Sequence, residues 1–114
     1  AHVVLLDASA AALKKTEEAL APTPGPASLS VVCDVTSDAA VEAAVKEVEA
    51  TFGKVTHLWN NAGYQGQVKP TDEYPLEDFQ KVQDINVVGA FRVIQCVAKS
   101  MKKSGGGVIV NTAS

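Results

Sequence analysis

The sequence lacks the features that mark several special classes of protein. It has only two cysteines, Cys33 and Cys96, too few for the disulfide framework of a small secreted domain. Cys33 lies in a strand-like run and Cys96 in a helical pattern, so we interpret both as small core residues in a reducing, cytoplasmic protein. No apolar run is long enough to span a bilayer, and no signal peptide pattern opens the chain. We therefore expect no membrane partner.

Excess positive charge, metal-ligand spacing and a phosphate-binding loop are also missing. The chain carries 10 Lys and Arg against 13 Asp and Glu, a net charge of −3, which argues against nucleic acid as a partner. His2 and His57 have no partners at ligand spacing, so we predict no metal site. The eight glycines form neither G-x-G-x-x-G nor a P-loop, so we expect these residues to hold no pyrophosphate.

What the chain does have is an alternation of short apolar runs with helical patterns. The expected strands are Val3–Leu6, Leu29–Cys33, Val55–Trp59 and Val108–Val110. Ser9 and Ser37 are placed to cap the helices that follow them, and Gly53 to end the second helix. The order β-α-β-α-β-α-β predicts a single α/β domain with a parallel sheet and right-handed crossovers.

The third helix is predicted to be long, from Pro75 to about Lys103, after a polar loop over 64–74. Asn86 and Gly89 fall in its interior, where both are poor helix formers. An interior asparagine either satisfies a backbone group opened at that point or is buried and hydrogen-bonded for packing. Both interpretations stay open at this point.

Polar residues close every expected strand. Because the carboxyl ends of parallel strands meet at one edge of a sheet, we expect these side chains to form one polar rim, the usual position of ligands in α/β sheets. Asp7 there could accept hydrogen bonds from the ribose hydroxyls of adenosine and repel a 2′-phosphate, or it could simply lead into a helix. Asp34 could equally be a turn residue. The rim consists of Asp7, Asp34, Thr36, Asn60, Asn61, Asn111, Thr112 and Ser114.

Five motifs in order give the chain a family resemblance. Asp7 follows an apolar strand, and the others are Cys33–Thr36 (CDVT), Asn60–Gly63 (NNAG), Ile85–Val87 (INV) and Gly107–Ser114 (GVIVNTAS). Together they resemble the middle of a classical short-chain dehydrogenase/reductase. The resemblance implies a Rossmann-like, doubly wound parallel sheet, of which 1–114 would supply the second to fifth strands. This would be part of a single NAD(P)-binding domain, with a glycine-rich loop expected upstream and Tyr-x-x-x-Lys downstream.

The resemblance also implies roles for rim residues. Asp7 would bind the adenosine ribose of NAD, and Asp34 with the backbone of Val35 would contact the adenine. The backbone of Asn86 would hold a water of the proton relay, and Ser114 would be the catalytic serine that hydrogen-bonds the substrate oxygen. The residues that would support the central strand and border the cofactor ribose are Asn61, Ala62 and Gly63.

By resemblance the function is hydride transfer between NAD and a secondary alcohol or ketone, in a homo-oligomer formed through the helix over 75–103. The alternative is a non-catalytic remnant or interaction module that pairs through exposed strand edges. NAD binding separates the two. Tyr64 and Tyr74 have no lysine four residues later, so we expect the general acid/base outside this chain.

Three further expectations concern packing. Trp59 would fill the core or tighten the sheet near the cofactor, and we expect Tyr64 and Gln65 to be exposed in a loop rather than to face the substrate. In the family's strand order, one strand would lie between Val3–Leu6 and Val55–Trp59. We therefore predict that the isolated 114 residues form no stable monomer, which a cooperative thermal unfolding transition would contradict.

Overall fold

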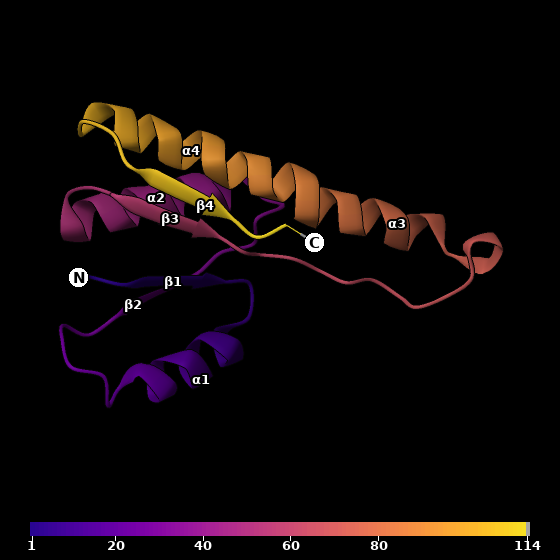
Figure 1. The fold of residues 1–114 in the computed structure, drawn as a ribbon, viewed down its shortest axis with the longest axis horizontal. Coiled ribbons are helices and arrows are strands. Elements are labelled where there is room, and N and C mark those ends of the chain that lie inside the picture. Colours follow the sequence, from indigo (N-terminus) through magenta and orange to yellow (C-terminus); the bar gives the residue numbers. More distant parts are fainter. Residues whose placement is uncertain (114) are drawn as a thin grey trace.

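The computed structural model describes residues 1–113, in which strands and helices alternate as predicted (Figure 1). The helical segments are α1 (Ala10–Leu20), α2 (Asp38–Phe52), the 3₁₀ turn η1 (Thr71–Glu73), α3 (Leu76–Gln83), the π-helix η2 (Asp84–Gly89) and α4 (Ala90–Lys103). The strands are β1 (Val4–Asp7), β2 (Leu29–Val32), β3 (His57–Asn60) and β4 (Val108–Asn111).

The strands form two parallel pairs. In one pair Val4 of β1 lies opposite Leu29 of β2, and in the other His57 of β3 lies opposite Val108 of β4. Strands β1 and β3 are not paired with each other. All four strands run in the same direction, so their carboxyl ends lie toward the same end of the molecule (Figure 1).

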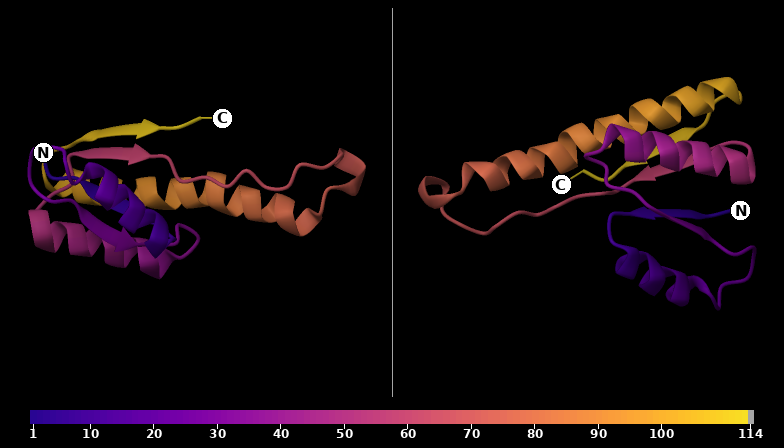
Figure 2. Two further views of the ribbon diagram at one scale, coloured as in Figure 1. Left: turned by 90° about the horizontal axis from the view of Figure 1, so that it is seen from below. Right: turned by 180° about the vertical axis from the view of Figure 1, so that it is seen from behind.

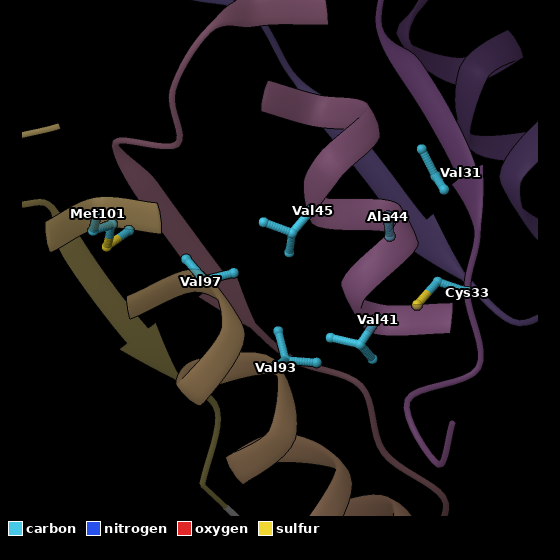
Figure 3. Close-up of a cluster of buried hydrophobic side chains, with 8 residues drawn as sticks. All are labelled: Val31, Cys33, Val41, Ala44, Val45, Val93, Val97 and Met101. Carbon is cyan, nitrogen blue, oxygen red and sulfur yellow. The ribbon is translucent and has the colours of Figure 1, made fainter. Parts of the chain in front are cut away.

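Helices cover both faces of the strands. Helices α2 and α4 pack against each other over one face, and α1 lies against β1 and β2 on the other (Figures 1 and 2). The core joins β2, α2 and α4, and apart from Met101 its buried side chains are small or β-branched and pack closely. Its buried members are Val31, Cys33, Val41, Ala44, Val45, Val93, Val97 and Met101 (Figure 3). Both cysteines are free, and Cys96 packs against this cluster.

The predicted helix caps are present. The Ser9 hydroxyl accepts a hydrogen bond from the backbone N–H of Ala12, and the Ser37 hydroxyl accepts one from Ala40, both at 3.2 Å. Gly53 ends α2 with φ of +84°, a conformation that favours glycine. These local contacts fix where α1 and α2 begin and where α2 ends.

The long third helix differs from its prediction at two points. Pro75 is the residue before the helix, with ψ of 128°, so α3 begins at Leu76. The hydrogen bonding also changes to the π pattern over Asp84–Gly89, the segment that contains Asn86. In a π turn the backbone hydrogen bonds join residues five apart instead of four, which widens the helix. Such turns frequently occur at functional sites. The segment over 64–74 was predicted to be a loop without helix or strand, but it contains the 3₁₀ turn η1.

The β3–β4 pair carries an exposed apolar face. Trp59 is 75% exposed and lies opposite Val110, which is also exposed, so Trp59 does not fill the core of the described residues. The loop before α3 and α3 itself project beyond the strands as an arm (Figure 1). Within residues 1–113, no helix has the length and apolar character that a membrane span requires.

Candidate functional site

Asn60 ties the carboxyl ends of β3 and β4 to the start of α4. Its side chain is 7% exposed, and its Nδ2 donates to the carbonyl oxygen of Ala90 at 3.1 Å and to Oδ1 of Asn111 at 3.2 Å. A buried amide with both bonds formed is stabilising, whereas its loss would leave buried groups without partners. The end of this strand pair is therefore held in one position relative to the long helix.

A second set of bonds lies on the other face of the same strand ends. The hydroxyl of Thr112 donates to Oδ1 of Asn61 at 2.7 Å and accepts from the indole N–H of Trp59 at 3.2 Å. The backbone N–H of Thr112 donates to the carbonyl oxygen of Asn60 at 3.1 Å, which continues the strand pairing by one residue. Trp59 thus tightens the end of the sheet. The predicted catalytic Ser114 lies outside the described residues.

Asn86 connects η2 to the segment that follows the Asn61–Gly63 loop. Its Oδ1 accepts from the backbone N–H of Tyr64 at 2.7 Å, and its Nδ2 donates to the carbonyl oxygen of the same residue at 3.0 Å. The side chain is exposed, so the packing interpretation of an interior asparagine is wrong. Asn86 instead satisfies the backbone of another segment. A Cβ added at Gly63 would lie 3.6 Å from the same Oδ1, which is ordinary contact.

Asp7 lies at the end of β1 with its side chain exposed. Its Oδ1 accepts from the backbone N–H of Ser9 at 2.8 Å, which orders the turn into α1. Among the described residues, no other group bonds to this carboxylate. The turn contact and a ligand contact are therefore compatible, because the second carboxylate oxygen has no competing donor there.

Asp34 and Val35 form the corresponding turn after β2. Oδ1 of Asp34 accepts from the backbone N–H of Thr36 at 2.9 Å and from its hydroxyl at 2.8 Å. The pKa of Asp34 lies below its ordinary value, first because of the Thr36 backbone bond and second because of the hydroxyl. The carbonyl oxygen of Val35 accepts from Nη1 of Arg92, and Arg92 forms an ion pair with Asp38.

Gly89 permits this turn to approach the long helix. A Cβ at position 89 would lie 2.7 Å from Cγ2 of Val35, closer than two carbon atoms can pack. Gly89 is buried within η2. The glycine in the helix interior is therefore explained by the close approach of Val35, the residue whose backbone is predicted to contact adenine.

Asp78 is a site residue that the sequence did not indicate. Its side chain is 8% exposed and accepts from the hydroxyls of Tyr64 at 2.9 Å and Tyr74 at 2.6 Å, and from the backbone N–H of Gln67 at 2.8 Å. Tyr64 is half-buried, so the expectation of a merely exposed loop residue is wrong. Gln65, in contrast, is exposed as predicted. The only signal in the sequence was the spacing of four between Tyr74 and Asp78 at the start of a helix.

These bonds shift the pKa values of all three groups. The hydrogen bond from Tyr74 is the first cause that lowers the pKa of Asp78, followed by the Gln67 backbone bond. The hydrogen bond to Asp78 is in turn the first cause that raises the pKa of both Tyr64 and Tyr74. Both phenols therefore stay protonated donors at neutral pH, the opposite of what a general base requires.

Comparison with known proteins places this geometry in a family. The family model described as short chain dehydrogenase matches residues 1–114. Levodione reductase of Leifsonia aquatica is 37% identical over 115 aligned residues, which cover 100% of this chain and 43% of that protein. D-threitol dehydrogenase of Mycolicibacterium smegmatis is 43% identical over 82 residues, 72% of this chain and 31% of that protein.

A solved structure agrees with the fold. The structure of NAD⁺-bound xylitol dehydrogenase superimposes with a TM-score of 0.94 at 46% identity, covering 99% of this chain and 43% of that one. The chain thus spans less than half the length of the relatives it matches. The parallel strands with helices on both faces are accordingly part of a Rossmann-like, doubly wound sheet. The chain belongs to the short-chain dehydrogenase family.

Proposed function

We propose that the protein containing this chain is an NAD-dependent oxidoreductase that transfers a hydride between nicotinamide and a secondary alcohol or ketone. The observation that carries the proposal is the rim itself. Asp7 at the end of β1, the Asp34–Val35 turn after β2 and the Asn61–Gly63 loop after β3 all lie toward the end of the molecule at which the strands finish (Figure 1). Relatives named as reductases and dehydrogenases, one of them solved with NAD⁺, support the same reaction class.

We call the residues at the ends of β1 and β2 the first half of the rim, and those at the ends of β3 and β4 the second half. The first half fits the adenosine part of the cofactor. Asp7 offers a carboxylate oxygen without a donor among the described residues, as bonding to two ribose hydroxyls requires. The same negative charge opposes a 2′-phosphate and favours NAD over NADP. Asp34 and the backbone of Val35 would border the adenine. Residues 1–114 would form part of a single NAD(P)-binding domain.

The residues of the second half would organise the reacting end. Asn61, Ala62 and Gly63 would border the cofactor ribose, and Ser114 would hydrogen-bond the substrate oxygen. The side chain of Asn86 is occupied by Tyr64, so its backbone carbonyl in the π segment would hold the water of the proton relay. The nicotinamide, when bound, supplies the hydride or accepts it.

The test compares cofactors in the protein expressed from its complete coding sequence. Wild type should oxidise or reduce members of a panel of secondary alcohols and ketones with NAD(H) in preference to NADP(H). Asp7→Ala should lower kcat/KM for NAD by about 10- to 100-fold, because bonds to a charged group are worth about 1.5–3 kcal/mol. The control is Glu18→Ala, which removes an exposed carboxylate on α1. It should leave kcat/KM unchanged for both NAD and NADP.

A protein that neither binds NADH nor turns over any member of the panel would overturn this proposal. It would then favour the alternative of a non-catalytic interaction module. If Glu18→Ala and Asp7→Ala changed kcat/KM for NAD equally, the proposed activity would stand. The assignment of Asp7 to the cofactor ribose would then be wrong. The two failures are therefore separable in one set of measurements.

We also propose that the helix over 75–103 packs against a second copy of the chain. Its exposed apolar side chains include Leu76 at 69%, Phe79 at 53% and Phe91 at 62% exposure. Apolar groups gathered on one long helix typically mark an interface. Phe91→Lys should shift the full protein toward monomers in sedimentation measurements, whereas Lys102→Glu at the exposed end of α4 should not.

Cellular location follows from the same proposal. The thiols of Cys33 and Cys96 are both free, which supports a reducing, cytoplasmic environment. Cell fractionation of the tagged protein checks this. If the tagged protein were recovered with an oxidising compartment, the proposed cytoplasmic location would be wrong.

A further inference from the structure

Tyr64 is held by the long helix at two separate places. Asn86 pairs with its backbone N–H at 2.7 Å and its carbonyl oxygen at 3.0 Å. Asp78 accepts from its hydroxyl at 2.9 Å, and Nζ of Lys81 lies 4.4 Å from the centre of its ring. The residue that directly follows the Asn61–Gly63 loop is therefore fixed at its backbone, its ring face and its hydroxyl.

The hydroxyl end of this arrangement is rigid. Asp78 is almost fully buried and also bonds Tyr74 and the backbone of Gln67. Gly66 completes the cluster, because a Cβ there would lie 2.4 Å from the Tyr74 hydroxyl oxygen and 2.9 Å from Oδ2 of Asp78. Its φ of +78° also favours glycine. Asp78 is thus a fixed point and not a mobile surface carboxylate.

Two fixed points define the orientation of Tyr64, whereas one would leave it free to pivot. Asp78 lies in α3 and Asn86 in the π segment, about two helical turns further along the same continuous helix. If the hydroxyl bond is lost, the backbone of Tyr64 can rotate about its contact with Asn86. The Asn86 side chain would then move with it.

We propose that Asp78 is a positioning residue that acts through the Tyr64 hydroxyl to orient Asn86 and the π segment around it. The inference rests on the proposed function, in which the backbone of Asn86 serves the proton relay. Asp78 itself touches neither Asn86 nor the Asn61–Gly63 loop among the bonds of the described residues; its effect passes through Tyr64.

The structure supplies a matched pair of variants to test this. Tyr64→Phe and Tyr74→Phe each remove one phenol that donates to Asp78, but only Tyr64 contacts Asn86. In the protein expressed from its complete coding sequence, Tyr64→Phe should lower kcat by about five- to tenfold, a part of what a proton relay contributes. KM for the cofactor should stay within about twofold, and the midpoint of the pH–rate profile should move.

Tyr74→Phe should change kcat by less than about twofold and leave the pH–rate profile in place. Hydrogen exchange gives a second readout that needs no turnover, because the amide of residue 64 donates to Asn86. Its exchange should accelerate in Tyr64→Phe and stay unchanged in Tyr74→Phe.

Equal effects of the two variants on kcat and on exchange would overturn the positioning role, as would an unchanged Tyr64→Phe. A wild type without any NAD-linked turnover would overturn the proposed function instead. The exchange comparison would still decide whether Asp78 orients Asn86 through Tyr64.

Discussion

After β1 and β2, the polar side chains of the rim bond to backbone groups two residues away, whereas after β3 and β4 they bond to segments far along the chain. Asp7 bonds Ser9, and Asp34 bonds Thr36. Asn60, in contrast, reaches Ala90 and Asn111, 30 and 51 positions away.

The difference separates two kinds of polar position. A carboxylate that orders its own turn keeps an exposed oxygen for a ligand and contributes little to the fold. An amide that joins distant segments is part of the tertiary structure, and its loss costs stability before any question of chemistry arises. The first half of the rim therefore keeps polar groups available to a ligand, and the second half holds its side chains in fixed positions.

The strongest test of this difference compares the loss of stability caused by Asn60→Ala with that caused by Asp34→Ala. Removing the buried amide should lower the free energy of unfolding by about 1–3 kcal/mol, because the Ala90 carbonyl loses its side-chain partner. The exposed Asp34 should cost less than about 0.5 kcal/mol. Denaturant unfolding of the full protein measures both, and equal losses would contradict the division of the rim.

Gly89→Ala probes a place where the turn after β2 depends on a distant segment. The added Cβ would collide with Val35, which costs about 1–3 kcal/mol and is partly offset by about 0.5–1 kcal/mol of helix propensity. The displaced turn should also raise KM for the cofactor severalfold in steady-state kinetics.

Gly63→Ala is the control from the second half. The nearest atom to its added Cβ is at 3.6 Å, so stability should change by no more than about 0.5 kcal/mol. A Gly89→Ala variant that keeps both its stability and its KM would show that Val35 adjusts freely, contrary to the close contact.

Arg92→Met should have a smaller effect. It removes the bond to the Val35 carbonyl and the ion pair with Asp38, whose side chain is 80% exposed. Exposed pairs are worth about 0.2–1 kcal/mol and are screened by salt. The difference in unfolding free energy between wild type and variant should therefore shrink in high salt. A loss that is the same at all ionic strengths would assign the effect to packing.

The smallest effect is expected at Thr36. Because the folded pKa of Asp34 is depressed, its stabilising contribution is complete above the ordinary value of 3.8 and is lost as the pH falls through the folded pKa. Thr36→Val removes the hydroxyl bond and keeps the backbone bond. The pKa of Asp34, followed by NMR titration, should rise toward 3.8 and stay below it. No movement would show that the hydroxyl of Thr36 does not contribute to the lowered pKa of Asp34.

The same division explains how much could be predicted from the sequence. The element order, the Ser9 and Ser37 caps and the stop at Gly53 are local and were all predicted correctly. The rim as a set of strand ends was also predicted, because parallel strands have only one carboxyl edge.

The contacts that could not be predicted join residues far apart. Nothing near Asp78 in the sequence indicates that Tyr64 returns to it, because that contact requires the loop over 64–74 to fold back along α3. The Arg92–Val35 bond spans 57 positions and depends on the missing side chain of Gly89. The predicted roles of Asp7, Asp34, Val35, Asn61, Ala62, Gly63, Asn86 and Ser114 in the reaction stay predictions.

The π segment accommodates about one residue more than a regular α-helix would. Along the long helix, Ile85, Gly89, Val93 and Val97 turn inward at steps of four, and in a regular α-helix each such step would overshoot by about 40°. The wider π turn absorbs about one residue of this drift. Deleting one residue from 84–89 would restore ordinary hydrogen bonding with little rotation of α3 about the helix axis, but it would also remove the widened turn from which Asn86 reaches Tyr64. The extra residue of this segment therefore serves the contact between Asn86 and Tyr64 rather than the register of the helix on either side.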